Sequence, residues 1–78
     1  MWHVYTLKCS DSTFYTGCTS DLDRRISEHN SRKVHYTADK TPVHLITFTS
    51  FNDKYKAFEF EKYLKTGSGI AFRNKHLI

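Results

Sequence analysis

Several features that often guide the interpretation of a small protein are scarce in this sequence. Two cysteines, one proline and three glycines among 78 residues indicate neither a disulfide-rich scaffold nor a low-complexity chain. No apolar run approaches the ~20 residues that cross a bilayer, and the N-terminus lacks the basic segment and apolar run of a secretory signal. We therefore expect a cytoplasmic protein that makes no membrane contact.

The two cysteines are not expected to pair. If the first two strands form a hairpin that turns near Asp11, Cys18 lies far from Cys9, beyond the reach of a disulfide. Their spacing also differs from the C-x-x-C pairs of zinc sites. Both observations favour free thiols, as expected in a reducing compartment.

Aromatic residues and positive charge are the two features present in quantity. Six Phe, five Tyr and one Trp provide large side chains for the core of one small domain, residues 1–78. Twelve Lys and Arg against eight Asp and Glu give a formal net charge of +4. This charge favours polyanionic partners such as nucleic acid.

The order of strand and helix patterns predicts an α+β fold. Apolar and β-branched runs predict three strands, Trp2–Cys9, Thr13–Cys18 and Pro42–Phe51. Capping signals and helical spacing predict three helices: one from an N-cap at Ser20 to about Asn30, one from Lys54 to about Thr66 with Gly67 as its C-terminal cap, and one from Ile70 to about His76. The order β-β-α-β-α-α indicates a three-stranded antiparallel sheet flanked by three helices.

The hairpin turn predicts which residues of the first two strands lie opposite each other. A turn at 10–12 places Gly17 opposite Tyr5 and Tyr15 opposite Leu7. The two tyrosines then share one face as a diagonal pair about 7–8 Å apart. Because glycine has no side chain, we expect an open notch beside the Tyr5 ring that a ligand could enter.

Charged and polar residues interrupt the inward faces of the two longer helices. The expected buried stripe of the first helix includes Arg25 and His29, and that of the second includes Glu61. A buried carboxylate requires a cationic partner, a metal or access to solvent. Two interpretations have equal weight: a structural ion pair between Arg25 and Glu61, or a cleft beside the tyrosines that both residues line.

Sequence motifs distributed along the chain resemble those of one enzyme family. The motifs are Val4-Tyr5, Tyr15-Thr16-Gly17-Cys18-Thr19, Asp21-Leu22, Arg25, His29-Asn30, and Ala57-x-x-x-Glu61-Lys62-Tyr63-Leu64-Lys65-x-Gly67-x-Gly69. In order and spacing they resemble the GIY-YIG nucleases, small single-domain type. Three positions depart from the pattern: His3 in place of the first motif glycine, Thr16 in place of an aliphatic residue, and Ile70 in place of a basic one.

The resemblance implies both a fold and a chemistry. Members of this family have a three-stranded antiparallel sheet flanked by helices and cleave phosphodiester bonds in DNA with one divalent metal ion, Mg²⁺ or Mn²⁺. By position, the resemblance assigns catalytic roles to Tyr5, Tyr15, Arg25, His29 and Glu61, a metal-ligand role to Glu61, and a structural role to Gly17. The general base is one of the two tyrosines, and Asn74 has no assigned role.

Two other functions are compatible with the same residues. The chain could be a catalytically inactive nucleic-acid-binding module, or a protein-interaction unit held by an Arg25–Glu61 ion pair. If it is a nuclease, a function in DNA repair or recombination follows from the resemblance. Because no separate DNA-reading segment is evident, we do not expect sequence specificity from this domain alone; dimerisation or a partner protein could provide the targeting.

Overall fold

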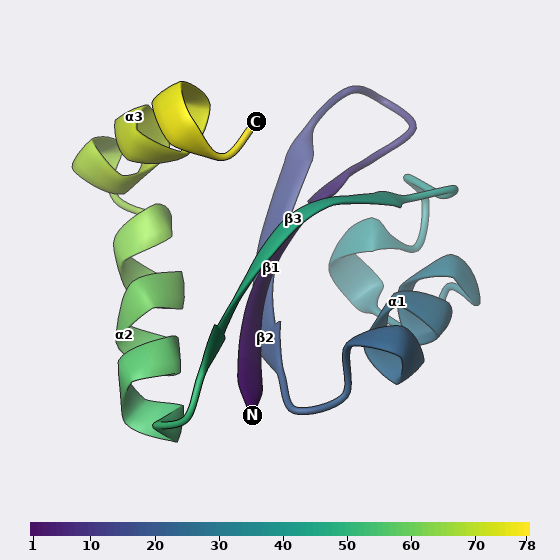
Figure 1. Ribbon diagram of the computed structural model, residues 1–78. Coiled ribbons are helices and arrows are strands. Elements are labelled where there is room, and N and C mark those ends of the chain that lie inside the picture. The colour runs from purple at the N-terminus through teal and green to yellow at the C-terminus, as the bar shows by residue number, and fades with distance from the viewer.

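The computed structural model describes residues 1–78 and confirms the predicted fold and element order (Figure 1). The strands are β1 (Trp2–Lys8), β2 (Phe14–Thr19) and β3 (His44–Phe51). The helices are α1 (Leu22–Asn30), α2 (Lys54–Leu64) and α3 (Gly67–His76). A single 3₁₀ turn, η1 (His35–Thr37), lies within the predicted loop between α1 and β3. No helix combines the length and apolar character needed to span a bilayer.

β1 is the central strand of the sheet, in the order β2-β1-β3, and both of its neighbours are antiparallel to it. The predicted hairpin register is confirmed, with Tyr5 opposite Gly17 and Leu7 opposite Tyr15. The pairing of β1 with β3 shifts by one residue between Thr6 and Leu7. β2 is therefore a free edge of the sheet, next to the strand that carries Tyr5.

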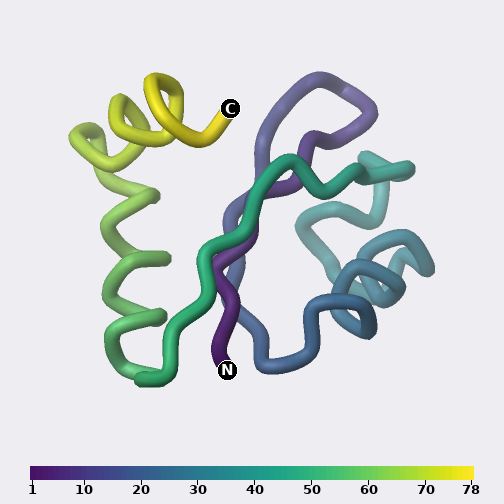
Figure 2. Tube along the Cα trace, in the orientation of Figure 1, coloured from purple at the N-terminus to yellow at the C-terminus, as the bar shows by residue number.

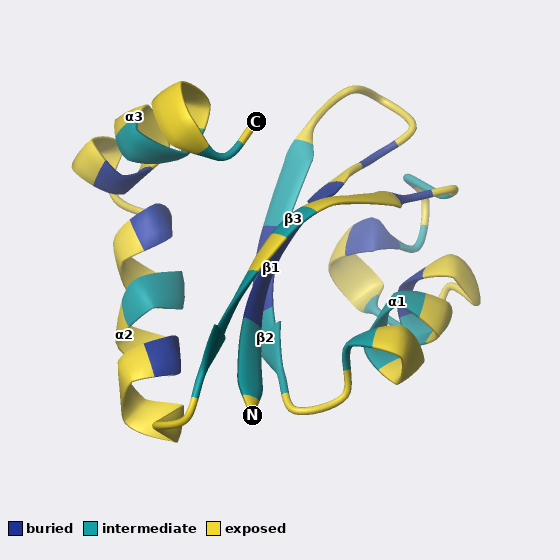
Figure 3. Ribbon diagram, viewed as in Figure 1, coloured by how far each residue is buried: buried dark blue, intermediate teal, exposed yellow.

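The helices form layers on both faces of the sheet. Figure 1 shows α1 and η1 on one side of the strands and α2 and α3 on the other. One buried cluster faces α1 and comprises Tyr5, Leu7, Cys9 and Val43. A second faces α2 and α3 and comprises Val4, Ala57 and Leu64, with Cys18 packed against it. Figure 3 shows β1 as the most continuously buried element. Cys9 and Cys18 are both free and belong to different clusters.

The predicted start of α1 was one residue early. Asp21, rather than Ser20, is the N-cap, and its carboxylate accepts a hydrogen bond from the Arg24 amide at 3.2 Å. The Thr19 hydroxyl accepts from the Asp21 amide at 3.1 Å, which fixes the bend between β2 and the helix. Both Ser and Asp are good N-caps, so propensity alone did not distinguish these neighbours.

The predicted junction between the last two helices was also wrong. Gly67 does not cap α2; that helix ends at Leu64, and Gly67 is the first residue of α3. The Thr66 hydroxyl joins the two helices, donating to the Tyr63 carbonyl at 2.6 Å and accepting from the Gly69 amide at 3.1 Å. α3 thus begins three residues before the predicted Ile70, and Figure 2 shows the chain turning sharply there.

Candidate active site

Tyr5 lies over Gly17 on the face of the sheet that α1 covers. Only 1% of Tyr5 is exposed. A Cβ atom at position 17 would lie 2.6 Å from Tyr5 Cζ and closer still to the hydroxyl oxygen, so only glycine leaves room for this ring. The predicted open notch beside Tyr5 is therefore occupied by the end of the Tyr5 side chain itself. Gly17 serves to position the Tyr5 hydroxyl.

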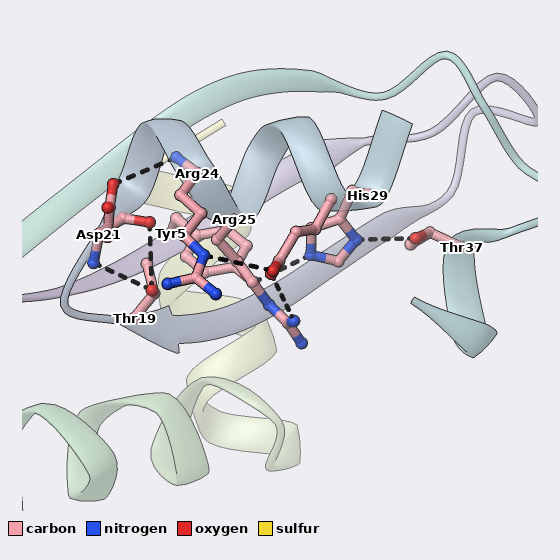
Figure 4. Close-up of polar contacts among 8 residues, drawn as sticks. Tyr5, Thr19, Asp21, Arg24, Arg25, His29 and Thr37 are labelled. Carbon is pink, nitrogen blue, oxygen red and sulfur yellow. Dashed lines mark hydrogen bonds and ion pairs between the residues drawn. The ribbon is translucent and has the colours of Figure 1, made fainter. Parts of the chain in front are cut away.

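The Tyr5 hydroxyl begins a buried chain of polar contacts. It lies 3.0 Å from His29 Nε2, and His29 Nδ1 lies 2.7 Å from the Thr37 hydroxyl (Figure 4). His29 and Thr37 are both fully buried. A neutral imidazole has one donor and one acceptor nitrogen. His29 therefore accepts the Tyr5 proton in a hydrogen bond when its Nδ1–H donates to Thr37.

Arg25 places a permanent positive charge beside this chain of contacts. Its side chain is 37% exposed, and Nη1 donates to Glu28 Oε1 at 3.1 Å. Burial raises the pKa of Tyr5 to about 12, and a hydrogen bond from the Arg25 guanidinium only partly offsets that rise. At neutral pH the phenol consequently keeps its proton while its oxygen faces a permanent positive charge.

Glu61 approaches from the opposite face of the sheet. Its carboxylate pairs with Lys65 on the next turn of α2, with Nζ and Oε2 3.1 Å apart. The predicted structural ion pair between Arg25 and Glu61 is therefore wrong, since each has a partner on its own helix.

The Glu61 charge nevertheless acts on groups in both layers. It contributes to raising the pKa of Tyr5 on one face and, after burial, that of Cys18 on the other. An effect on both groups is consistent with a carboxylate near β2, one of the two edge strands, where Gly17 presents no side chain. Glu61 is thus within electrostatic reach of Tyr5 but not in hydrogen-bond contact with it.

Tyr15 forms the outer wall beside this group. Its ring centroid lies 6.3 Å from that of Tyr5 and 5.0 Å from that of His29, on the predicted shared face. The Tyr36 ring also packs against Tyr15, with the centroids 5.3 Å apart. Sequence reasoning missed Tyr36 and Thr37 because both lie in a stretch without periodicity, and only the η1 turn brings them to His29 and Tyr15.

The arrangement offers few metal ligands. No group of three or more His, Cys, Asp or Glu side chains is placed to hold a metal ion. Among the predicted site residues only Glu61 provides a carboxylate, and it binds Lys65 through one oxygen. A single carboxylate fits a hard cation such as Mg²⁺, which commonly keeps several waters and takes further ligands from substrate phosphate.

The buried histidine gives the protein a predictable response to acid. Burial, and next the positive charge of Arg25, lower the pKa of His29 below its ordinary value of 6.5. The unfolded chain then binds this proton more tightly than the folded chain. The stability contributed by neutral His29 is fully present above pH 6.5 and is lost as the pH falls from there through the folded pKa.

We expect urea unfolding, followed by Trp2 fluorescence, to give a lower free energy of unfolding at about pH 5.5 than at about pH 7.5. His29→Gln should flatten this difference, whereas His44→Gln, at an exposed position of β3, should preserve it. Glu28 does not interfere, because a hydrogen bond from Arg25 lowers its pKa below 4.5. An unchanged pH dependence in His29→Gln would contradict this assignment.

Comparison with known proteins identifies the family to which this fold and site belong. The model of the GIY-YIG catalytic domain matches residues 1–72, so the chain belongs to the GIY-YIG family. The group of polar residues around Tyr5 therefore lies in a domain that the family describes as catalytic, and such domains typically use a divalent metal. The resemblance drawn from the motifs is confirmed.

Relatives similar in sequence to this chain are small proteins called UPF0213. One from Halobacterium salinarum is 46% identical over 66 residues, covering 83% of this chain and 86% of that protein. One from Streptococcus agalactiae is 42% identical over 64 residues, covering 81% of this chain and 73% of that protein. The solution NMR structure of a UPF0213 protein from Bacillus halodurans is 34% identical, with a TM-score of 0.60, and covers 96% of this chain and 84% of that one.

Proposed function

We propose that this protein is a metal-dependent DNA endonuclease that hydrolyses phosphodiester bonds. The observation that carries the proposal is the buried Tyr5 hydroxyl, which lies 3.0 Å from His29 Nε2 and close enough to the Arg25 guanidinium for that charge to lower the pKa of Tyr5, in a GIY-YIG domain. A buried core tyrosine needs only one partner for its hydroxyl. A base on one side and a half-exposed cation on the other suit proton transfer next to a bound phosphate.

In this proposal Tyr5 and His29 activate water together. A phenol with a pKa of about 12 is protonated at neutral pH and cannot act alone as a base. As the Tyr5 oxygen takes a proton from the attacking water, its own proton passes to His29 Nε2, 3.0 Å away. Thr37 holds the imidazole in the accepting tautomer. Of the two motif tyrosines, Tyr5 is assigned as the base because it contacts His29.

Arg25 would bind the phosphate. Its planar fork matches two phosphate oxygens, and its half-exposed side chain is accessible to substrate. Glu28, which it contacts here, also pairs with Arg24 at 3.5 Å and so retains a partner when Arg25 moves. Arg25 then stabilises the charge that develops on the phosphate in the transition state.

Glu61 would hold the metal ion, Mg²⁺ or Mn²⁺. When bound, that ion would stabilise negative charge on the leaving oxygen. For Glu61 to bind it through both oxygens, the contact with Lys65 must open, which costs little for a partly exposed i,i+4 pair. Tyr15 lines the site, and Gly17 keeps space for Tyr5. A place in DNA repair or recombination, and a partner that provides targeting, stay predictions.

The direct test is metal-dependent cleavage of duplex, branched and flapped DNA. We expect nicking with Mg²⁺ or Mn²⁺, none in EDTA, and loss of detectable nicking in Glu61→Gln. Glu59→Gln is the matched control, since Glu59 is exposed on the same helix and its substitution makes the same change in charge. Equal trace cleavage by wild type and both variants would reject the nuclease and favour an inactive nucleic-acid-binding module.

A further inference from the structure

A groove runs beside the candidate site, along the free edge of β2. Its volume is about 340 Å³, near the lower limit of the roughly 300–1,000 Å³ found for small-molecule sites. Its walls come from β2, the η1 turn and the junction of α2 with α3. The side chains that matter here are Phe14, Tyr15, Tyr36, Lys65, Ile70 and Arg73.

The groove combines aromatic faces with positive charge. The Arg73 guanidinium lies 5.0 Å from the ring centroid of Phe14, and Lys65 Nζ lies 5.9 Å from that of Tyr15. Arg73 donates to the Asn74 side chain, at 3.0 and 3.2 Å, and has no carboxylate within ion-pair distance. No acidic residue lines the groove. Its chemistry therefore suits a ligand that is both planar and anionic.

Two residues connect the groove to the candidate site. The Tyr15 ring packs against His29 in the candidate site and also against Tyr36 in the groove wall. Lys65 is in the groove wall and also pairs with Glu61. A nucleic-acid strand whose phosphate lies between Arg25 and Glu61 would thus have its neighbouring nucleotide at the groove.

We propose that this groove binds one unpaired nucleotide next to the cleaved bond, with its base against the aromatic wall and its phosphate beside Arg73 and Lys65. The inference rests on the proposed nuclease function and specifies its substrate class as DNA with a single-stranded segment at the cleavage point. A base within a duplex already stacks on both faces and cannot present one to Tyr36 or Phe14. A groove of this volume is also large enough for one nucleotide.

This role also accounts for one departure from the family pattern. Ile70 replaces the basic residue that would follow Gly-x-Gly, and it is one of the apolar residues that line the groove. The positive charge is provided one turn later by Arg73. An aliphatic residue near the aromatic side chains is suited to contact with a base, whereas a lysine there would favour contact with the phosphate backbone of the nucleic acid alone.

Binding without cleavage tests the groove separately from the nuclease. In EDTA, fluorescence anisotropy would measure the dissociation constants for labelled oligothymidylate and for a duplex of equal length. We expect Tyr36→Ala to weaken single-strand binding about tenfold or more, and Arg73→Gln to weaken it several-fold. The matched controls are Tyr55→Ala, where Tyr55 is 75% exposed, and Lys75→Gln, on the exposed side of α3. Duplex binding should differ little between groove and control variants.

Chemical-shift changes provide a second readout that needs no variant. Thymidine 5′-monophosphate should shift the amide resonances of Phe14, Ile70 and Arg73 more than those of the β3 strand. Equal losses of single-strand affinity in the groove and control variants, or chemical-shift changes spread over the whole surface, would overturn the proposed role of the groove. Groove-dependent binding without any cleavage by the wild type would keep the groove and reject the nuclease. If the wild type cleaves DNA and the Tyr36→Ala and Arg73→Gln variants cleave it equally well, the nuclease function would be kept and the role of the groove rejected.

Discussion

Gly69→Ala is expected to lower the free energy of unfolding by about 3 kcal/mol or more. A Cβ atom at Gly69 would lie 2.7 Å from Leu64 Cα and would overlap the Tyr63 carbonyl group. Neither neighbour can easily retreat. The Tyr63 carbonyl accepts hydrogen bonds from the Thr66 hydroxyl and amide, and Leu64 is only 2% exposed in the core.

Gly67 provides the matched control on the same turn of helix. A Cβ atom there would meet nothing within 4 Å, and neither glycine has a positive φ. Gly67→Ala should therefore leave stability unchanged or raise it by up to about 1 kcal/mol, because alanine restricts the unfolded chain. Urea unfolding of both variants measures the difference. Equal midpoints for Gly67→Ala and Gly69→Ala would show that the two helices do not pack as described.

Arg25→Gln is expected to reduce the rate of DNA cleavage by about 10²–10³-fold, the range for loss of a positioned donor to developing charge. The guanidinium is a permanent charge that lowers the pKa of the Tyr5 hydroxyl, and in the proposed mechanism its fork would bind the phosphate. Its loss removes both functions. The fold should tolerate the change, since the side chain is 37% exposed and Glu28 keeps Arg24 as a partner.

Arg24→Gln makes an equal change in charge one residue earlier. The Arg24 side chain is 76% exposed and contacts the same Glu28, but it does not contact Tyr5. We expect cleavage by this variant to stay within about threefold of wild type, the effect of a screened surface charge. Single-turnover cleavage rates at saturating metal would compare the two. A similar loss in both variants would mean that Arg25 acts through general surface charge and would contradict its role at the phosphate.

The strands and the face of α1 were predictable because local patterns determine them. Alternation and a compact turn were sufficient to place Gly17 opposite Tyr5, and helical spacing was sufficient to point His29 inward. The end of α2 was mispredicted for a physical reason. A glycine after a helix usually marks its end, but here the Thr66 hydroxyl caps a new helix within the same turn.

The rest of the site depends on contacts that spacing does not encode. Thr37 reaches His29 from an irregular segment, and Tyr36 reaches Tyr15 from the same turn. Periodicity marked Glu61 as an inward-facing carboxylate but did not identify its partner, which is Lys65 on its own helix rather than Arg25. The expected notch beside Gly17 was mistaken because the size of the Tyr5 side chain, and not the gap alone, decides what fills it.

The contact of His29 with Thr37 has a consequence for the timing of the reaction. Thr37 is completely buried, so the chain of hydroxyl, imidazole and hydroxyl ends inside the protein. In the proposed mechanism, a proton transferred to His29 Nε2 would therefore return through the oxygen of Tyr5. The imidazole would hold the proton until the Tyr5 oxygen accepts it again, on the side of the protein where the cleaved strand leaves. Return of that proton would accordingly have to precede the next turnover.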